Sequence, residues 1–298
     1  MKHGDTGNAK DSATTLSSRG AYLTLVANEP FVIGELVLRE SLRRCGSIYE
    51  FVVALTESGD RRIERRLQAI GVHTVRVSYE APPDVATFDA AAHRWNVKLA
   101  KLGVFRLAEY SKLVFLDADT IALANLDALI DLPHMSAVRT RALQHGGTAY
   151  GFNSGVMGLE PNRADEFDIA RAHARVHAQF SYLGQPYGDQ NVLNEALPDW
   201  HSYPSLQLPD GFIVFFGSLD DYVRRSGFTA SGDSRRPGVR LVHFTGVHKP
   251  WERRMAFALK AAVRSPRHRR KLPALAGLRV LAEYWRIEVC VRRMWRHA

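Results

Sequence analysis

Cysteine is scarce in this chain, with two residues, Cys45 and Cys290, among 298. So few cysteines exclude a disulfide scaffold and a cysteine-rich zinc module, and they fit a reducing compartment, so we expect a cytoplasmic protein. No run of about 18 apolar residues occurs, which a membrane-spanning helix would require. The first residues also lack the apolar centre of a secretory signal, and their polar composition predicts that residues 1–20 are disordered.

A net positive charge is absent from most of the chain, although the total net charge is +9. Residues 252–298 contain 13 Lys and Arg and 3 Glu, a net charge of +10, which leaves residues 1–251 close to neutral. A nucleic-acid-binding surface spread over the whole fold is therefore excluded. With 46% hydrophobic and 24% charged residues, the chain has the balance of a globular protein with a sizeable core.

The first third of the chain alternates between apolar runs and amphipathic segments. Expected strands are 21–27, 51–55 and 72–77, and expected helices are 28–45 and 63–70. This alternation predicts parallel strands joined by crossover helices, a Rossmann-like half. No glycine-rich phosphate loop follows the first strand, which argues against a Walker-type or dinucleotide site. Later expected strands are 112–116, 156–159 and 241–244, and later expected helices are 97–110, 163–180 and 189–197.

The sharpest local signal is Asp117-Ala118-Asp119, which follows the apolar run 112–116 directly. Residues i and i+2 of an extended chain point to the same side, so the two carboxylates repel each other unless a cation lies between them. Ligands of open α/β sheets also gather at the carboxyl ends of strands. On the tripeptide alone, a pair of turn-forming aspartates without a metal stays an equal alternative.

A second motif, within residues 241–251, offers a third metal ligand. His243 ends an apolar run, Gly246 permits a close backbone approach, and Lys249 offers an ammonium to a phosphate. Taken singly, a histidine at such a place is more often a satisfied core or surface group. Together with the aspartates, it forms a coherent site for a cation and a diphosphate.

Two short polar motifs complete the set. Residues 151–155, Gly-Phe-Asn-Ser-Gly, predict a tight loop that presents Asn153 and Ser154 to a ligand, with an ordinary Gly-Asn turn as the alternative. Residues 188–191, Gly-Asp-Gln-Asn, predict a helix N-terminus capped by Asp189. Capping and a ligand-facing role are compatible.

The ordered motifs Asp-Ala-Asp, Phe-Asn-Ser-Gly-Val, Gly-Asp-Gln-Asn and His-Phe-Thr-Gly-x-x-Lys-Pro-Trp resemble glycosyltransferase family 8, in its glycogenin-like branch, which also includes galactinol synthases. The resemblance implies a GT-A fold, an α/β domain with a Rossmann-like central mixed sheet flanked by helices. We expect this catalytic domain at 21–251, between the disordered residues 1–20 and a basic helical extension at 252–298. It further implies retaining transfer of a hexose, glucose or galactose, from a UDP-sugar to an unidentified acceptor, and a homodimer as a family expectation.

The resemblance also implies roles for individual residues. The implied metal ligands are Asp117, Asp119 and His243, and this donor set favours Mn²⁺, with Mg²⁺ as the alternative. The implied contacts to the nucleotide and its diphosphate are Leu25, Asn28, Ala118, Gly246 and Lys249. The implied sugar-facing or catalytic residues are Lys101, Asn153, Asp189 and Gln190. For a retaining reaction we expect Asp189 to orient a sugar hydroxyl rather than to form a covalent intermediate.

Three departures from the family pattern are present. Pro186 stands where glycogenin-like members often carry an aspartate, Phe31 where they carry a tyrosine, and Ala27 replaces a hydroxyl residue. Pro186 leaves the acceptor and self-glycosylation open. Two other functions stay open as well: a catalytically silent nucleotide-sugar binder of the same fold, and a nucleotidyltransferase that shares an acidic metal pair.

The basic C-terminal region has three interpretations. Residues 274–298 predict an amphipathic helix with a broad apolar face and, opposite to it, Arg279, Arg286, Arg293 and Arg296. We favour packing of this helix on the catalytic core, with the arginines in solvent. The second interpretation is peripheral attachment of residues 264–298 to the inner face of an anionic membrane. Binding of nucleic acid is the least favoured.

Overall fold

A computed structural model describes residues 20–26, 28–86, 99–140, 151–161, 168–226, 238–246, 248–252 and 274–298. The expectation of disorder at residues 1–19 and the basic run at 264–271 lie outside these residues. Gly20, the last residue of the segment expected to be disordered, already belongs to the first strand.

The centre of the fold is a mixed seven-stranded sheet with the order β3-β2-β1-β4-β7-β6-β8. Its strands are β1 (Gly20–Val26), β2 (Glu50–Thr56), β3 (His73–Val77), β4 (Lys112–Leu116), β6 (Ala137–Arg139), β7 (Phe152–Leu159) and β8 (Gln207–Leu208). Strands β3, β2, β1 and β4 run parallel, as the alternating sequence pattern predicts, whereas β7 is antiparallel to β4 and to β6. The expected central mixed sheet is confirmed.

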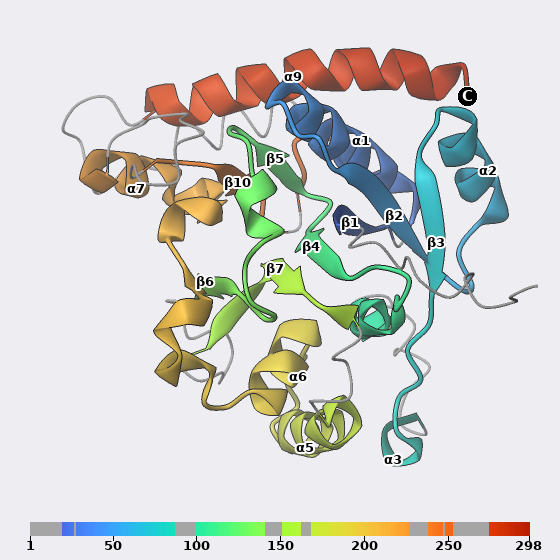
Figure 1. The fold of residues 1–298 in the computed structure, drawn as a ribbon, viewed down its shortest axis with the longest axis vertical. Helices are drawn as coiled ribbons and strands as arrows, with labels where there is room; N and C mark the ends of the chain where they lie inside the picture. Colours follow the sequence, from blue (N-terminus) through green and yellow to red (C-terminus); the bar gives the residue numbers. More distant parts are fainter. Residues whose placement is uncertain are drawn as a thin grey trace, which may run out of the picture.

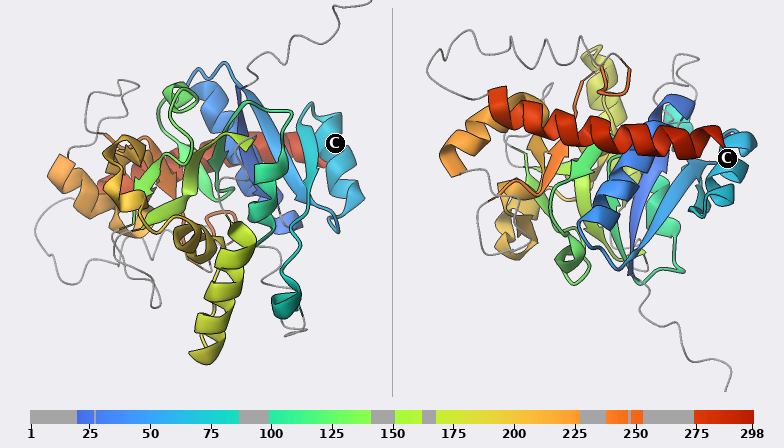
Figure 2. Two further views of the ribbon diagram at one scale, coloured as in Figure 1. Left: turned by 60° about the horizontal axis from the view of Figure 1, so that its bottom comes forward. Right: turned by 90° about the horizontal axis from the view of Figure 1, so that it is seen from above.

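Helices cover both faces of this sheet (Figure 1). One face carries α1 (Glu29–Arg44), α2 (Arg61–Ala69), α7 (Leu219–Ser226) and α9 (Ala274–Arg296). The opposite face carries α5 (Ile169–Tyr182) and α6 (Asp189–Ala196). A short helix, α3 (Pro83–Ala86), follows β3. Figure 2 shows α9 lying across α1 when the molecule is seen from above, and α5 projecting from the other side.

Two hydrophobic clusters form the core, one on each face of the sheet. Alternate residues of a strand point to opposite faces. Tyr22 of β1 therefore joins the cluster under α1 and α9, whereas its neighbour Leu23 joins the cluster under α5 and α6. The nearly continuous apolar composition of β1 and β4 follows from this burial on both faces.

A second sheet places the end of one distant segment beside the Asp-Ala-Asp turn. It consists of β5 (Thr120–Ala122), β10 (Leu241–His243) and β9 (Val214–Phe215), in the order β5-β10-β9. Strand β10 pairs antiparallel with β5, so that His243 lies opposite Thr120. The Phe244 backbone N–H then donates to the Asp119 carbonyl at 2.9 Å. This pairing brings together residues that are more than a hundred positions apart.

The tight loop predicted at residues 151–155 is wrong, because four of these residues belong to strand β7. Phe152 and Asn153 pair with β6, and Val156 continues the same strand along β4. The glycine within the motif serves close packing instead of a turn. A Cβ at Gly155 would lie 2.8 Å from the Ile213 side chain and 2.9 Å from the Asp117 carboxylate.

Two helix predictions also differ from the structure. Within the predicted helix 97–110, the described part is a 3₁₀ helix, Ala100–Arg106. Gly103 in its middle lies against the backbone of Ser78. A Cβ at this position would lie only 2.4 Å from the Ser78 carbonyl oxygen, so a side chain does not fit there. Helix α5 begins at Ile169 and is capped by Asp168, whose carboxylate accepts from the Arg171 N–H at 2.8 Å. Residues 163–167 of that prediction lie outside the described residues.

Candidate functional site

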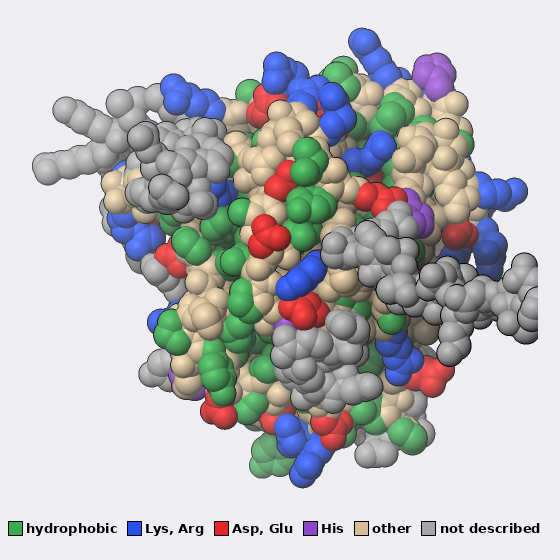
Figure 3. All heavy atoms as spheres, viewed as in Figure 1, with side chains coloured by type: hydrophobic (Ala, Val, Ile, Leu, Met, Phe, Trp, Pro, Cys, Tyr) green, Lys and Arg blue, Asp and Glu red, His purple; other side chains and the backbone are tan. Residues whose placement is uncertain are grey.

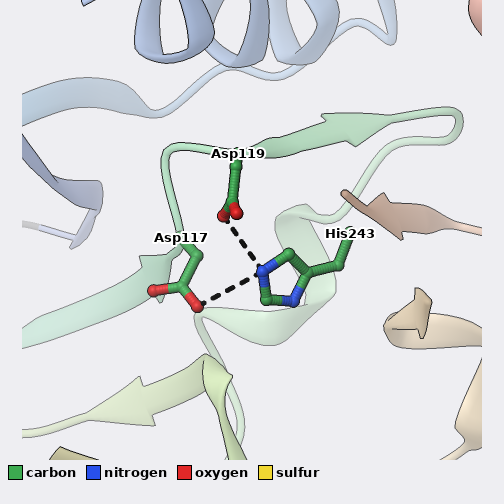
Figure 4. A group of neighbouring side chains, drawn as sticks. All are labelled: Asp117, Asp119 and His243. Atoms are coloured by element: carbon green, nitrogen blue, oxygen red, sulfur yellow. Dashed lines mark ion pairs between the residues drawn. The ribbon is translucent and has the colours of Figure 1, made fainter. Parts of the chain in front are cut away.

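Two acidic side chains and one imidazole converge at the carboxyl end of β4 (Figure 4). Asp117 and Asp119 lie in the turn between β4 and β5, and His243 ends β10. The His243 Nε2 lies 3.0 Å from the Asp119 Oδ1 and 3.7 Å from the Asp117 Oδ2. One ligand atom of each residue lies within 4.8 Å of the others, so a single ion can be shared by all three.

The backbone of the turn is fixed on both sides. The Asp117 N–H donates to the Gly155 carbonyl at 3.0 Å, and the Thr120 Oγ1 donates to the Asp117 carbonyl at 2.7 Å. The position of Ala118 between the aspartates is also constrained, because its carbonyl lies 2.6 Å from where a Cβ of Gly34 would be. Helix α1 therefore packs directly against the turn that presents both carboxylates.

Charge within the group favours ionised ligands. Burial alone would raise the pKa of Asp119, but the His243 ring and the Lys249 ammonium outweigh it and hold that pKa below its usual range. Burial alone would lower the pKa of His243, and the nearby Asp119 and Asp117 carboxylates raise it instead. The carboxylate of Asp119 thus stays available to a cation at neutral pH.

The donor set fits a divalent cation. Two carboxylates and one imidazole are hard and borderline ligands, the combination that Mn²⁺ accepts and that Mg²⁺ accepts less readily. The buried Nδ1 of His243 has no hydrogen-bond partner in the part of the chain that the structure describes.

A lysine approaches the same group from the segment after β10. The Lys249 Nζ lies 2.5 Å from the Asp119 Oδ2 and donates to the Phe244 carbonyl at 3.0 Å. The chain reaches this position through Gly246, whose φ of 105° lies in the region that favours glycine. Among the described residues that are not its chain neighbours, none has a heavy atom within 4 Å of the Cβ position of Gly246, so backbone conformation rather than packing explains this glycine.

Asp117, Asp119 and His243 are called the candidate metal group below. A second buried lysine links this group to the start of α6. The Lys101 Nζ lies 2.9 Å from the Asp117 Oδ1 and 3.1 Å from the Asp189 Oδ2, and it donates to the Ser154 carbonyl at 2.6 Å. The Ser154 Oγ donates to the same Asp189 oxygen at 2.7 Å. Burial alone would lower the pKa of Lys101, but the two carboxylates outweigh it and the pKa rises, so the amine stays charged.

Strand β7 and helix α6 are joined by amide side chains. The Gln190 Oε1 accepts from the Asn153 Nδ2 at 3.0 Å and from the Ser154 N–H at 3.3 Å. Asn194, one turn further along α6, accepts from the Phe152 N–H at 2.8 Å and donates to its carbonyl at 2.9 Å. These bonds fix Asp189 and Gln190 relative to the Asp-Ala-Asp turn. Asp189 is the first residue of α6 and Gly188 is its N-cap, so the predicted capping by Asp189 is wrong. Sequence reasoning missed Asn194, although its i+4 spacing from Gln190 on a predicted helix was a usable signal.

Leu25 lies in β1 and Asn28 just after it, at the same edge of the sheet as the Asp-Ala-Asp turn. Leu25 is half-buried in β1, the strand that pairs with β4, and Asn28 is exposed at the position before α1. The amphipathic pattern with Pro30 near its start predicts that Asn28 caps this helix; Asn28 is the N-cap residue of α1, but its side chain makes no capping hydrogen bond. Their roles toward a nucleotide stay predictions.

Comparison with known proteins decides the family. Residues 25–255 match the family model for glycosyl transferase family 8. The chain belongs to this family. Human glycogenin-1 is 30% identical over 239 residues, which cover 78% of this chain and 62% of glycogenin-1. UDP-glucuronate:xylan alpha-glucuronosyltransferase 1 of Arabidopsis thaliana is 30% identical over 236 residues, which cover 78% of this chain and 32% of that protein.

Family 8 membership agrees with the fold found in solved structures. The galactosyltransferase LgtC, in complex with donor and acceptor sugar analogs, superposes with a TM-score of 0.55 at 16% identity, covering 89% of this chain and 95% of LgtC. The apo form of the glycosyltransferase GlyE of Streptococcus pneumoniae superposes with a TM-score of 0.52 at 14% identity, covering 91% of this chain and 60% of GlyE. The expected GT-A fold is confirmed. The chain spans from about a third to under two thirds of the length of the curated relatives named here.

Helix α9 lies outside the residues that match the family model, and its apolar face packs on the core. The fully buried side chains of this face are Val280, Leu281, Tyr284, Ile287 and Val291. The exposed side chains of α9 include Arg279, Arg286, Arg293 and Arg296. Lys and Arg side chains are seen at the upper rim of the molecule in Figure 3, where α9 lies. Among the described helices, none has both the length and the apolarity needed to cross a membrane.

Proposed function

We propose that this chain is a retaining, divalent-metal-dependent hexosyltransferase that moves glucose or galactose from a UDP-sugar to a hydroxyl acceptor. The observation that carries the proposal is the convergence of Asp117, Asp119 and His243 within shared coordination distance. The Lys249 ammonium adjoins them on one side and Lys101 on the other. Such a set of charges matches a nucleoside diphosphate bound through a cation.

The site has to stabilise the diphosphate that leaves the donor sugar during transfer. Cleavage of the anomeric C–O bond leaves negative charge on the β-phosphate, and a bound divalent ion supplies Lewis-acid stabilisation of that charge. Lys249 adds a second positive charge on a buried side chain, where it acts more strongly than in water. We expect Asp117, Asp119 and His243 to hold the metal, preferably Mn²⁺.

We propose that Asp189 orients a sugar hydroxyl. Its Oδ2 receives both the Lys101 ammonium at 3.1 Å and the Ser154 hydroxyl at 2.7 Å. A carboxylate oxygen held by two donors is a weaker nucleophile than a free one, which supports positioning over covalent catalysis. Gln190 and Asn153, already bound to each other, would contact the same sugar. A glycosyl-enzyme trapped on Asp189 and detected by mass spectrometry would contradict this assignment.

A donor screen tests the function. UDP-glucose, UDP-galactose, UDP-N-acetylglucosamine and UDP-glucuronate are each incubated with Mn²⁺ or with a chelator, and UDP release is measured. UDP-glucuronate is included because an Arabidopsis relative is named for it. We expect turnover of UDP-glucose or UDP-galactose that the chelator abolishes. Asp119→Asn should lower the rate about 10²–10³-fold, whereas Asp131→Asn, at an exposed aspartate, should not change it.

The same screen, extended by UDP binding and by UTP with a sugar phosphate, separates the alternatives. UDP binding without any turnover would indicate a silent nucleotide-sugar binder. Release of pyrophosphate from UTP with a sugar phosphate, instead of UDP from a UDP-sugar, would indicate a nucleotidyltransferase. The acceptor is not named by the residues of the site, and a homodimer stays a family expectation.

Peripheral membrane attachment stays a separate prediction for the exposed face of α9. Its apolar face is buried against the core, so a contact with lipid would depend on exposed arginines and the partly exposed Leu278 and Val289. Sedimentation with anionic vesicles, compared between the full chain and a variant with Arg279, Arg286 and Arg293 replaced by Gln, tests it. Equal sedimentation of the two proteins would exclude this face as the attachment site.

A further inference from the structure

Helix α9 contacts the segment that carries Lys249 through two side-chain hydrogen bonds to consecutive backbone carbonyls. The Trp285 Nε1 donates to the Pro250 carbonyl at 3.2 Å, and the Arg292 Nη2 donates to the Trp251 carbonyl at 2.9 Å. These carbonyls belong to a turn that is closed by the Glu252 N–H donating to the Lys249 carbonyl at 3.1 Å. Buried backbone carbonyls need partners, and α9 supplies them here.

Arg292 is itself held in place by a buried carboxylate. Its Nε donates to the Glu288 Oε1 at 2.6 Å, and the Glu288 side chain is fully buried. Because Glu288 lies one turn before Arg292 on the same helix, the guanidinium is fixed in one orientation. The bond to the Trp251 carbonyl is therefore made by a preorganised donor.

Aromatic packing gives the same segment a second support. The Tyr284 ring stacks on Trp251, with centroids 6.4 Å apart, and meets the Phe244 ring edge-on at 5.2 Å. Phe244 follows the candidate metal ligand His243, and its carbonyl accepts from the Lys249 Nζ. One residue of α9 thus contacts both ends of the segment 244–251.

From these contacts we infer that Arg292 and Trp285 are positioning residues, which fix residues 248–251 so that Lys249 is held beside Asp119 to bind the diphosphate of the donor. The inference rests on the proposed function. The C-terminal helix is then part of the donor site, although it lies outside the residues that match the family model. A helix that merely covered an apolar face would not need two polar side chains aimed at carbonyls next to Lys249.

The test compares matched arginines that are neighbours in the chain. Arg292→Met removes the bonds to Glu288 and Trp251 and keeps an unbranched apolar stem, whereas Arg293→Met changes an exposed arginine. Affinity for UDP and for UMP is measured by calorimetry with Mn²⁺, and thermal unfolding confirms that each variant is folded. We expect Arg292→Met to weaken UDP binding about tenfold and UMP binding much less, because Lys249 is assigned to the second phosphate.

Two further variants keep the test decisive. Arg292→Lys retains a cationic donor and should recover part of the UDP affinity. Trp285→Phe keeps the ring but removes the N–H, and it decides the matter if Arg292→Met does not fold. Equal UDP affinities for folded Arg292→Met, Trp285→Phe and Arg293→Met would overturn the inference alone. Absence of UDP binding in the unchanged protein would overturn the proposed function, and the inference with it.

Discussion

The ammonium of Lys101 lies 3.1 Å from the carboxylate of Asp189, although Lys101 precedes the Asp-Ala-Asp turn in the sequence and Asp189 follows it. The same ammonium lies 2.9 Å from Asp117, so one buried lysine joins a candidate metal ligand to the candidate sugar-orienting residue. Removal of one partner from a buried charge group leaves the others uncompensated, which costs about 3–5 kcal/mol. This relationship makes the contribution of Lys101 measurable.

We expect Lys101→Met to lower the free energy of unfolding by about 3 kcal/mol or more, because Asp117 and Asp189 then repel each other. The double variant Lys101→Met with Asp189→Asn should recover part of that loss but none of the transferase activity. Lys112→Met is the matched control, because Lys112 pairs with Glu160 at a partly exposed site, and its loss should cost about 1 kcal/mol or less. Urea unfolding of the unchanged protein, the single variants Lys101→Met and Asp189→Asn, the double variant and Lys112→Met measures all these values. Additive effects of the Lys101 and Asp189 substitutions would contradict the proposed coupling.

A second prediction concerns a glycine inside a helix. Gly34 of α1 has no room for a side chain, since a Cβ would lie 2.6 Å from the Ala118 carbonyl and 2.7 Å from the Trp251 ring. Gly34→Ala should therefore push α1 away from the Asp-Ala-Asp turn and cost about 1–3 kcal/mol, despite the better helix propensity of alanine. Mn²⁺-dependent UDP binding, followed by calorimetry, should weaken as well.

The control for Gly34 is a second glycine within a helix. Gly277 of α9 has the Phe216 ring at 3.5 Å from its Cβ position, an ordinary contact distance. Gly277→Ala should stabilise the protein by about 0.5–1 kcal/mol and leave UDP binding unchanged. If both substitutions stabilised the protein equally, the close packing of α1 against the turn would be refuted.

The sequence predicted the parts of the site that are local, and it missed those that depend on distant pairing. Asp117 and Asp119 follow an apolar run, so their place at the end of a strand was predictable. The segment 152–155 was not predictable in the same way. Its glycine and asparagine favour a turn, but its pairing with β6, and the pairing of the residues that follow it with β4, make it extended.

The contacts of α9 show the same limit. The arginines of this helix look alike in the sequence, and the amphipathic pattern separates an apolar face from a basic one. The pattern does not reveal that Arg292 turns inward to Glu288 and Trp251 while Arg293 stays exposed. Likewise, the sequence offered His243 as a third ligand beside the aspartates, but it did not reveal why they converge. The physical cause is the pairing of β10 with β5.

A third prediction follows from a buried histidine on α5. His173 lies between the hydroxyls of Tyr79 at 3.0 Å and Tyr187 at 2.9 Å, and Tyr187 precedes Asp189 by two residues. Burial, with a smaller effect of His177, lowers the pKa of His173 to about 4. As the pH falls, the imidazole of His173 is protonated near pH 6.5 in the unfolded chain but only near pH 4 in the folded protein. Its contribution to stability is therefore fully present above about pH 6.5 and is lost as the pH falls toward 4.

His173→Gln keeps an amide donor and acceptor but cannot titrate. We expect its melting temperature to fall less steeply than that of the unchanged protein between about pH 6.5 and 4, as measured by calorimetry at intervals through this range. Loss of the bond to Tyr187 should also lower turnover, because the chain leading to Asp189 is less firmly held. Parallel melting curves over this range would exclude His173 as the titrating group.

The last prediction concerns a carboxyl group that the proposed mechanism does not use. Glu35 of α1 is fully buried, and neither of its carboxyl oxygens has a hydrogen-bond partner among the described residues. Burial raises the pKa of Glu35 to about 8, against an opposing effect of Arg39. The folded protein therefore holds a proton that the unfolded chain releases above about pH 4.5. Stability falls as the pH rises from there to 8, by up to about 1.4 kcal/mol per pH unit.

Glu35→Gln removes this loss, so the variant should exceed the unchanged protein in stability at pH 8 and differ little from it near pH 4.5. Glu40→Gln, on the same helix, should instead destabilise the protein by a similar amount at both pH values. Arg43 and Arg44 hold the pKa of Glu40 at about 2, so its ion pairs stabilise the folded state above about pH 4.5 and are lost in acid. Urea unfolding at both pH values gives the free energy of unfolding of each protein. The difference between each variant and the unchanged protein cancels the contributions of the other titrating groups. Equal effects of Glu35→Gln at pH 4.5 and 8 would show that Glu35 is ionised in the folded protein.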